Sequence, residues 1–79
     1  MPLYYLNIFD DFCAYDEEGV ECIDINAAKG KAVAGIRSLI IAQIQEGRPV
    51  IGSHHIEIRD ANNVALEVIY FKDIIDLRI

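Results

Sequence analysis

An uninterrupted helical pattern over residues 25–46 does most to limit what this chain can fold into. No proline falls within that stretch. Its apolar residues recur at spacings of three and four, which marks the buried face of an amphipathic helix. Asp24 is placed to cap the first turn, and Gly47 followed by Pro49 ends the helix. The recurring apolar positions are Ala28, Ala32, Ile36, Leu39, Ile40 and Ile44.

Extended segments flank this helix on both sides. Residues 3–9 alternate as a strand, and residues 12–15 return after a turn, while residues 20–23 are extended but short. Residues 54–59 and 64–71 predict a second hairpin, whose connecting loop contains asparagines that tolerate a positive φ. Residues 72–77 show one turn of helical spacing. We therefore predict an α+β fold, a four-stranded and mainly antiparallel sheet (β-β-α-β-β along the chain) packed on one long helix, as a single domain over residues 1–79.

The predicted helix carries few charges for a surface helix. Val33 and Ile41 lie beside the main apolar stripe, and small residues occupy much of the remaining surface. Hydrophobic residues make up 53% of the 79-residue chain, above the usual share of about 45–50%. Two interpretations stay open. Val33 and Ile41 belong to a second buried face that another protein copy or partner completes, or to an alanine-rich surface that is simply exposed.

Negative charge is concentrated in the first third of the chain. Residues 1–28 contain seven acidic residues and no lysine or arginine, while the rest of the chain is close to neutral. Because nucleic-acid binding draws its affinity from lysine and arginine, direct nucleic-acid binding is disfavoured. A basic protein partner, or solubility alone, fits this charge better. The start of the chain lacks a signal-peptide pattern and no stretch is apolar enough to span a membrane, so a cytoplasmic location and reduced cysteines are expected.

The order of short motifs along the chain resembles a known family. The motifs are a Pro-x-Tyr-Tyr strand at 2–5, Asp-Glu-Glu-Gly at 16–19, Ala-Ala at 27–28, Gly-Arg-Pro at 47–49, Ile-Glu-Ile-Arg-Asp at 56–60 and Phe-Lys-Asp at 71–73. Together they are similar to short bacterial proteins catalogued as domain of unknown function 6894. The resemblance covers nearly the whole chain and implies the fold, but no activity. Cys13, Cys22 and the Asn62-Asn63 turn depart from the family's usual pattern.

The first half of the chain also resembles antitoxin domains of the HicB type. These similarly run from a tyrosine-rich strand through an acidic Glu-Glu-Gly segment, here at residues 17–19, to an alanine-rich helix. The resemblance implies a regulator that binds a small basic protein. A Pro-x-x-Pro-Gly-like strand ending, which such domains carry, is missing here.

Catalytic and metal-binding chemistry finds little support in the residue spacing. Cys13 and Cys22 are nine residues apart and His54 and His55 are adjacent, whereas zinc ligands usually come in close pairs. A nucleophilic site would have to combine a cysteine with His55 and Glu57, and no local signature supports it. Neither an EF-hand register nor a phosphate-binding glycine loop is present. We therefore expect no catalytic residues, no metal and no cofactor.

A helix on one side of the sheet leaves the other side open, and that open face is the expected contact surface. The candidate interaction residues are Tyr5, Phe9, His55, Glu57 and Ile69 on the open face, with Val33 and Ile41 on the helix. The leading hypothesis is a non-catalytic protein-interaction or self-association module, active as a homodimer. The alternative is a HicB-like regulator that binds a basic protein partner.

Overall fold

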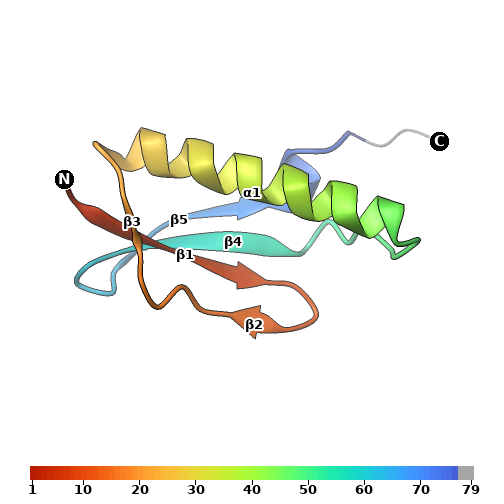
Figure 1. Ribbon diagram of the computed structural model, residues 1–79, viewed down its shortest axis with the longest axis horizontal. Helices are drawn as coiled ribbons and strands as arrows, with labels where there is room; N and C mark the ends of the chain where they lie inside the picture. Colours follow the sequence, from red (N-terminus) through yellow and green to blue (C-terminus); the bar gives the residue numbers. More distant parts are fainter. Residues whose placement is uncertain (77–79) are drawn as a thin grey trace.

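The computed structural model describes residues 1–76 and consists of one helix lying on one face of an antiparallel sheet (Figure 1). The predicted α+β class with a single helix is confirmed. The elements in chain order are β1 (Leu3–Phe9), β2 (Cys13–Ala14), β3 (Val20–Glu21), α1 (Ile25–Gln45), β4 (His55–Asp60), β5 (Ala65–Tyr70) and the 3-10 turn η1 (Phe71–Asp73).

The sheet has five strands rather than the predicted four. Its order is β2-β1-β4-β5, and β3 pairs with β1 along the same edge as β2. The additional strand arises because Val20 lies opposite Tyr4 and Glu21 opposite Leu3, while Cys13 lies opposite Phe9 at the other end of β1. A two-residue strand is too short to show alternation, so only its pairing with a distant segment identifies it.

The helix begins and ends where its sequence signals stand. The Asp24 carboxylate accepts a hydrogen bond from the Ala27 amide at 2.9 Å, as expected of an N-cap. After Gln45, Gly47 adopts a φ of +70°, the left-handed conformation that ends many helices. Helix and caps are therefore determined by residues close to one another in the chain.

One position of the predicted buried stripe was wrong. Ile44 is 60% exposed, whereas Gln43 is buried with 4% of its surface accessible. Each step of four residues turns a helix about 40° beyond a full circle, so a stripe that continues in fours drifts away from a flat sheet. The buried line runs Ala28, Ala32, Ile36 and Ile40, then steps by three to Gln43.

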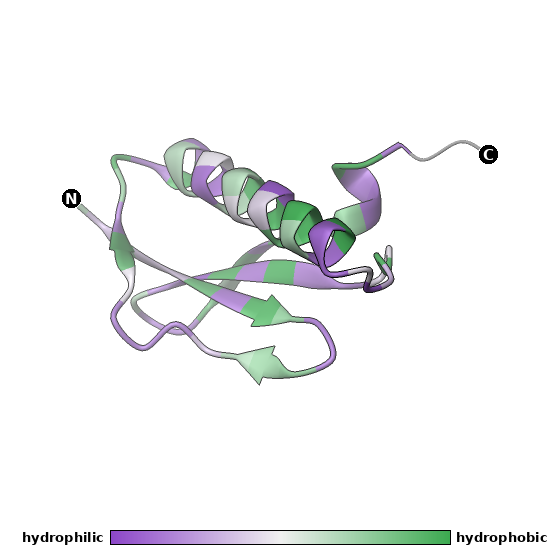
Figure 2. Cartoon of the chain, turned by 45° about the vertical axis from the view of Figure 1, so that its right-hand side comes forward, coloured by the Kyte–Doolittle hydropathy of each residue, from purple (hydrophilic) through white to green (hydrophobic). Residues whose placement is uncertain are grey.

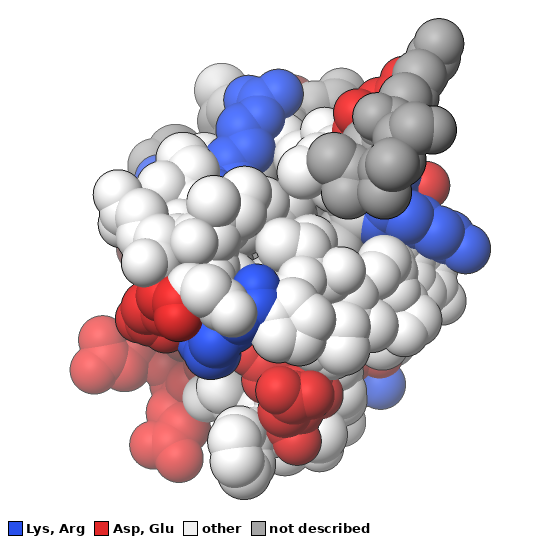
Figure 3. All heavy atoms as spheres, turned by 90° about the vertical axis from the view of Figure 1, so that its right-hand side faces the viewer, with Lys and Arg blue, Asp and Glu red and all other residues white. Residues whose placement is uncertain are grey.

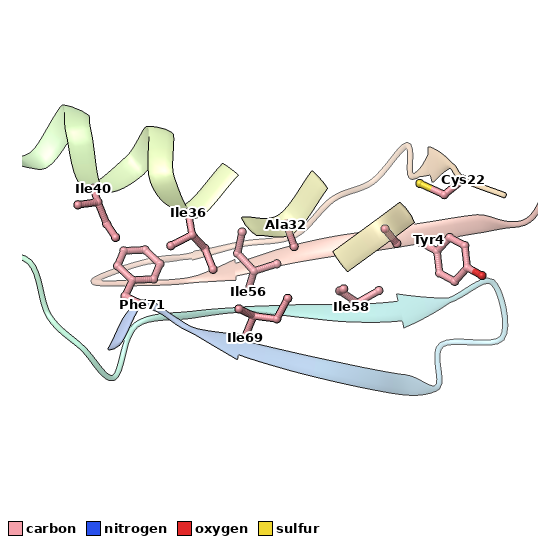
Figure 4. Close-up of a cluster of buried hydrophobic side chains, with 10 residues drawn as sticks. Tyr4, Cys22, Ala32, Ile36, Ile40, Ile56, Ile58, Ile69 and Phe71 are labelled. Atoms are coloured by element: carbon pink, nitrogen blue, oxygen red, sulfur yellow. The ribbon is translucent and has the colours of Figure 1, made fainter. Parts of the chain in front are cut away.

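The core is a single layer between α1 and the sheet (Figure 4). Ile56 of β4 lies beneath Ile36 and Ala32 of the helix, Ile58 lies further along β4 towards Tyr4, and Phe71 closes the other end with no exposed surface. Figure 2 shows the alternation of hydrophobic and hydrophilic residues along β4 that directs these side chains to one face. The remaining buried apolar members are Tyr4, Cys22, Ala28, Ala32, Ile40 and Ile69.

The second hairpin turns as its asparagines predict. Asn63 has a φ of 63°, and the Asp60 carboxylate accepts hydrogen bonds from the amides of Asn62 and Val64, both at 2.9 Å. A further irregularity between Ile58 and Arg59 shifts the pairing of β4 with β5. Such a bulge increases the local twist of a hairpin.

The chain after β5 folds back beside the helix. Ile74 and Ile75 are partly buried and pack against the core, in line with the helical spacing predicted for 72–77. Leu77, the last residue of that predicted turn, lies outside the described residues. Within the described part of the chain, no helix combines the length and the apolarity needed to cross a membrane.

Candidate interaction surface

A row of rings crosses the open face of the sheet, the face turned away from α1. Phe9 and His55 are direct cross-strand partners, and their rings stack with centroids 5.0 Å apart. Tyr15 meets the Phe9 ring edge-on at 5.9 Å, and the Tyr70 ring lies 5.1 Å from that of His55. The Lys72 ammonium lies 5.2 Å from the centre of the Tyr70 ring. An apolar strip with a cation at one end therefore spans β1, β4 and β5.

Cross-strand register places these rings side by side. Phe9, His55 and Tyr70 stand directly opposite one another on successive strands. Because directly opposite residues point to the same face, the three rings form one line across the sheet. Each aromatic contact contributes about 0.5–1.5 kcal/mol beyond the burial of apolar area. The row therefore stabilises the sheet and also presents flat, partly exposed surfaces to solvent.

A polar cluster lies beside this row. Arg59 donates two hydrogen bonds to the Glu57 carboxylate, at 2.7 and 3.2 Å, and a third to the Asn63 carbonyl at 2.7 Å. These hydrogen bonds from the guanidinium, helped by one from the buried Asn7 side chain, lower the pKa of Glu57 below its usual value. The same pairing raises the pKa of Arg59. Both groups are therefore engaged with each other.

The Asp16 carboxylate organises the loop that borders this cluster. It accepts hydrogen bonds from the backbone amides of Leu6, Glu18 and Gly19, at 3.3, 3.2 and 2.9 Å. The Asp16 amide in turn donates to the Asn7 side-chain oxygen at 3.0 Å. An open hollow of about 290 Å³ lies over this arrangement. Its lining consists of Tyr5, Asn7, Tyr15, Asp16, Arg59, Asp60, Ala61 and Asn63.

Most of the predicted open-face residues share one face, but Ile69 does not. Tyr5, Phe9, His55 and Glu57 occupy alternate positions that point away from the helix. Ile69 lies opposite Ile56 and is buried in the core with 8% of its surface exposed, so its placement on the open face was wrong. The alternation of β5 instead turns its even-numbered residues to the open side.

Val33 and Ile41 do not share one environment. Val33 is partly buried against the core, whereas Ile41 is 56% exposed. Ile41 and Ile44 border a hollow of about 300 Å³, whose lining also includes Ile74 and Ile75. We call Arg37, Ile41 and Ile44 the helix flank. Figure 3, which views the molecule from this end, shows uncharged atoms filling the centre and acidic side chains gathered below them.

Several residues of these surfaces were not among the sequence candidates. Asn7 and Arg59 belong to the polar cluster, Tyr70 and Lys72 extend the ring row, and Ile44 belongs to the helix flank. The alternation within β5 could have indicated Tyr70, since it stands next to an inward-facing residue. No sequence signal indicates the Asn7 contact, because it depends on a loop folding back from residue 16.

The two cysteines lie far apart. Cys13 is exposed opposite Phe9, while the amide of the buried Cys22 donates to the Pro2 carbonyl at the other end of β1. Seven strand residues separate these ends by roughly 20 Å, too far for a disulfide. Among residues 1–76, no group of three or more histidine, cysteine or acidic side chains is arranged to hold a metal ion.

Comparison with known proteins identifies a family and no activity. No curated protein and no solved structure matches this chain. The model of one family matches residues 3–72, which include all five strands and the helix. The chain therefore belongs to the family described as Domain of unknown function (DUF6894).

Proposed function

We propose that this protein is a non-catalytic protein-interaction module that self-associates as a homodimer. The observation that carries the proposal is the exposure of Ile41 and Ile44, at 56% and 60%, beside a hollow lined by further isoleucines. Contiguous apolar surface of this kind marks interaction sites in soluble proteins. A second copy of the chain would remove it from water.

The lining of the hollow beside Asp16 and Arg59 supports a role without catalysis. The residues that line it include no cysteine, serine or histidine, which are the usual side chains of a nucleophile and its base. Its Arg59 is bound to Glu57, and the Asp16 carboxylate is bound to backbone amides. These groups hold the sheet and its loop in place.

A cytoplasmic location is part of this proposal. Cys13 and Cys22 are free thiols that cannot reach each other within one chain. Free thiols are typical of a reducing compartment, so this arrangement supports the location. Fractionation of cells that express the chain with an epitope tag checks it, since recovery in a membrane or exported fraction would contradict it.

Multi-angle light scattering over a concentration series tests self-association. We expect a mass of twice 8.9 kDa at the upper concentrations and a decline towards 8.9 kDa on dilution. A mass of 8.9 kDa throughout the series would overturn the proposed homodimer. Sedimentation velocity of the same samples separates a closed dimer from open-ended aggregation.

A second candidate is a regulator that binds a small basic protein. The observation that favours it is the first hairpin, where Phe12 and Tyr15 are 82% and 65% exposed among acidic residues. Exposed aromatics within a field of one charge suit a partner of opposite charge. The test is a pull-down in which a distinct basic protein is bound at low salt and lost when Phe12 is changed to Ser.

A further inference from the structure

Strand β5 forms an outer edge of the sheet and contains neither lysine nor proline. Within residues 1–76 it pairs with β4 on one side only, whereas β1 is paired on both sides. Proteins usually protect such an edge with lysine, proline or inward-pointing charge. β5 has the sequence Ala-Leu-Glu-Val-Ile-Tyr, and its single charged residue, Glu67, points inward, where the Lys29 ammonium of α1 lies 3.7 Å away and offsets its charge. The edge is thus available to another strand.

The directions of the backbone groups along this edge follow from the ladder with β4. The Phe71 amide donates to the His54 carbonyl at 2.8 Å, which makes these two residues a hydrogen-bonded pair. In an antiparallel ladder such pairs alternate, so Ile69 bonds to β4 and the neighbouring Tyr70 and Val68 turn their amides outward. The Tyr70 amide accordingly donates to the Asp73 carboxylate at 3.3 Å rather than to β4.

Val68 therefore stands at the centre of the free edge. Its amide and carbonyl point away from β4, and the Asp73 carboxylate occupies the next outward amide towards the C-terminus. Its side chain is on the open face and is 36% exposed. An incoming antiparallel strand could form a hydrogen-bonded pair with Val68 in both directions.

The helix flank lies on the same side of the molecule as this edge. Lys29 reaches Glu67 of β5, which shows which side of α1 faces that strand. Ile41 and Ile44, near the end of α1, border a hollow with Ile74 and Ile75, which follow β5 in the chain. The edge of β5, in the sheet layer, and the exposed isoleucines, in the helix layer, therefore lie on the same side of the molecule.

We propose that a second copy of the chain pairs with β5 in antiparallel orientation, about a two-fold axis that passes beside Val68. The proposal rests on the proposed homodimer and identifies its surface. Val68 in each copy then donates to, and accepts from, Val68 of the other. Leu66 of one copy faces Tyr70 of the other on the open side, and the two helix flanks approach each other on the opposite side.

The charge distribution favours a second copy at this edge over the opposite one. The strands at the opposite edge belong to the acidic first third of the chain, so two such edges would repel each other. The β5 side carries Lys29, Arg37 and Lys72 against Glu67 and Asp73, which nearly cancel. Pairing through β5 also leaves the two acidic edges at the far ends of a continuous sheet.

A stable dimer needs contacts from both the β5 edge and the helix flank. A stable dimer buries at least about 1,000 Å² in total, and a single pair of six-residue strands covers less than that. The isoleucines of the helix flank supply the remaining apolar area. With the two-fold axis beside Val68, each residue of β5 lies opposite a residue that points to the same face of the joined sheet. Both helices therefore lie on one face of that sheet.

Val68→Pro tests the edge directly. Proline removes an outward amide that makes no bond to β4, so the protomer ladder stays intact while the pairing between copies is lost. Sedimentation equilibrium should show the dimer dissociation constant rising by about 100-fold, because two hydrogen bonds are lost and the carbonyl of residue 68 in each copy is left buried without a donor. Val68→Thr keeps the amide and the branched side chain, and should dimerise like the unaltered chain.

A second variant and an independent measurement keep the test decisive if Val68→Pro does not fold. Ile44→Lys places a charge on the helix flank, and because Ile44 is already exposed, it should leave the fold intact while weakening the dimer. Amide hydrogen exchange of the unaltered dimer should show slow exchange at Val68 that becomes fast on dilution. Far-UV circular dichroism reports the fold of each variant.

The outcomes separate this proposal from the homodimer itself. If the unaltered chain is monomeric at every concentration, the proposed homodimer fails and the edge pairing fails with it. If the chain is dimeric and a folded Val68→Pro variant dimerises equally well, or the Val68 amide exchanges rapidly in the dimer, the homodimer stands and β5 pairing is overturned. Loss of the dimer in both folded variants, with Val68→Thr unaffected, supports β5 pairing.

Discussion

Phe9 and His55 stack on the open face of the sheet, with ring centroids 5.0 Å apart and ring planes 16° from parallel. They are direct partners across β1 and β4, so the stack connects the first hairpin to the second. The contact is therefore both a stabilising link between distant segments and part of the surface offered to solvent.

Replacing Phe9 with alanine should lower the free energy of unfolding by about 2 kcal/mol, through lost apolar burial and two lost ring contacts. Phe12→Ala is the matched control, because Phe12 is 82% exposed. It should change stability by less than about 0.5 kcal/mol. Urea denaturation of both variants gives the comparison, and equal losses would show that the stack contributes nothing specific.

The contribution of Glu57 should depend on pH in a defined direction. Arg59 lowers the pKa of Glu57 in the folded state below the unfolded value of 4.5. A lowered carboxyl pKa gives stability that is present above the unfolded pKa and is lost as the pH falls through the folded one. We expect the difference in unfolding free energy between the unaltered chain and Glu57→Gln to be constant near neutral pH and to shrink below pH 4.5. A difference that grows on acidification would contradict this assignment.

The Asp16 carboxylate should stabilise the first hairpin through its bonds to three backbone amides. Asp16→Ala removes the acceptor oxygens of all three hydrogen bonds, and the expected loss of stability is about 2 kcal/mol. Glu17→Ala removes a neighbouring exposed acid and should be nearly neutral. Thermal denaturation of the two variants measures the effect, and an unchanged midpoint for Asp16→Ala would exclude this role.

Two glycines should respond to alanine in opposite directions. Gly47 has a φ of +70°, so Gly47→Ala should lower stability by about 1 kcal/mol even though there is open space around it. Gly30 lies inside α1, where an added methyl group also meets nothing within 4 Å. Gly30→Ala should therefore raise stability by about 0.5–1 kcal/mol. Chemical denaturation of both variants checks the signs.

The helix and its ends could be predicted from the sequence because their causes are local. The Asp24 cap, the apolar spacing that follows and the Gly47 stop all act within a few residues of one another. The turn at Asn63 is local in the same sense, since its positive φ and its hydrogen bonds involve residues 60–64. The α+β class follows from these signals combined with the alternation of the longer strands.

Tertiary structure alone decided the fifth strand, the place of Ile69 and the identity of the free edge. β3 exists because two residues meet the start of β1, and Ile69 is buried because it lies opposite Ile56. The drift of α1 over the sheet exposes Ile44, and the ladder with β4 turns the Val68 amide outward. Each of these depends on register between segments far apart in the chain. A local pattern determines which residues form an element, but its partners determine which groups remain free to bind.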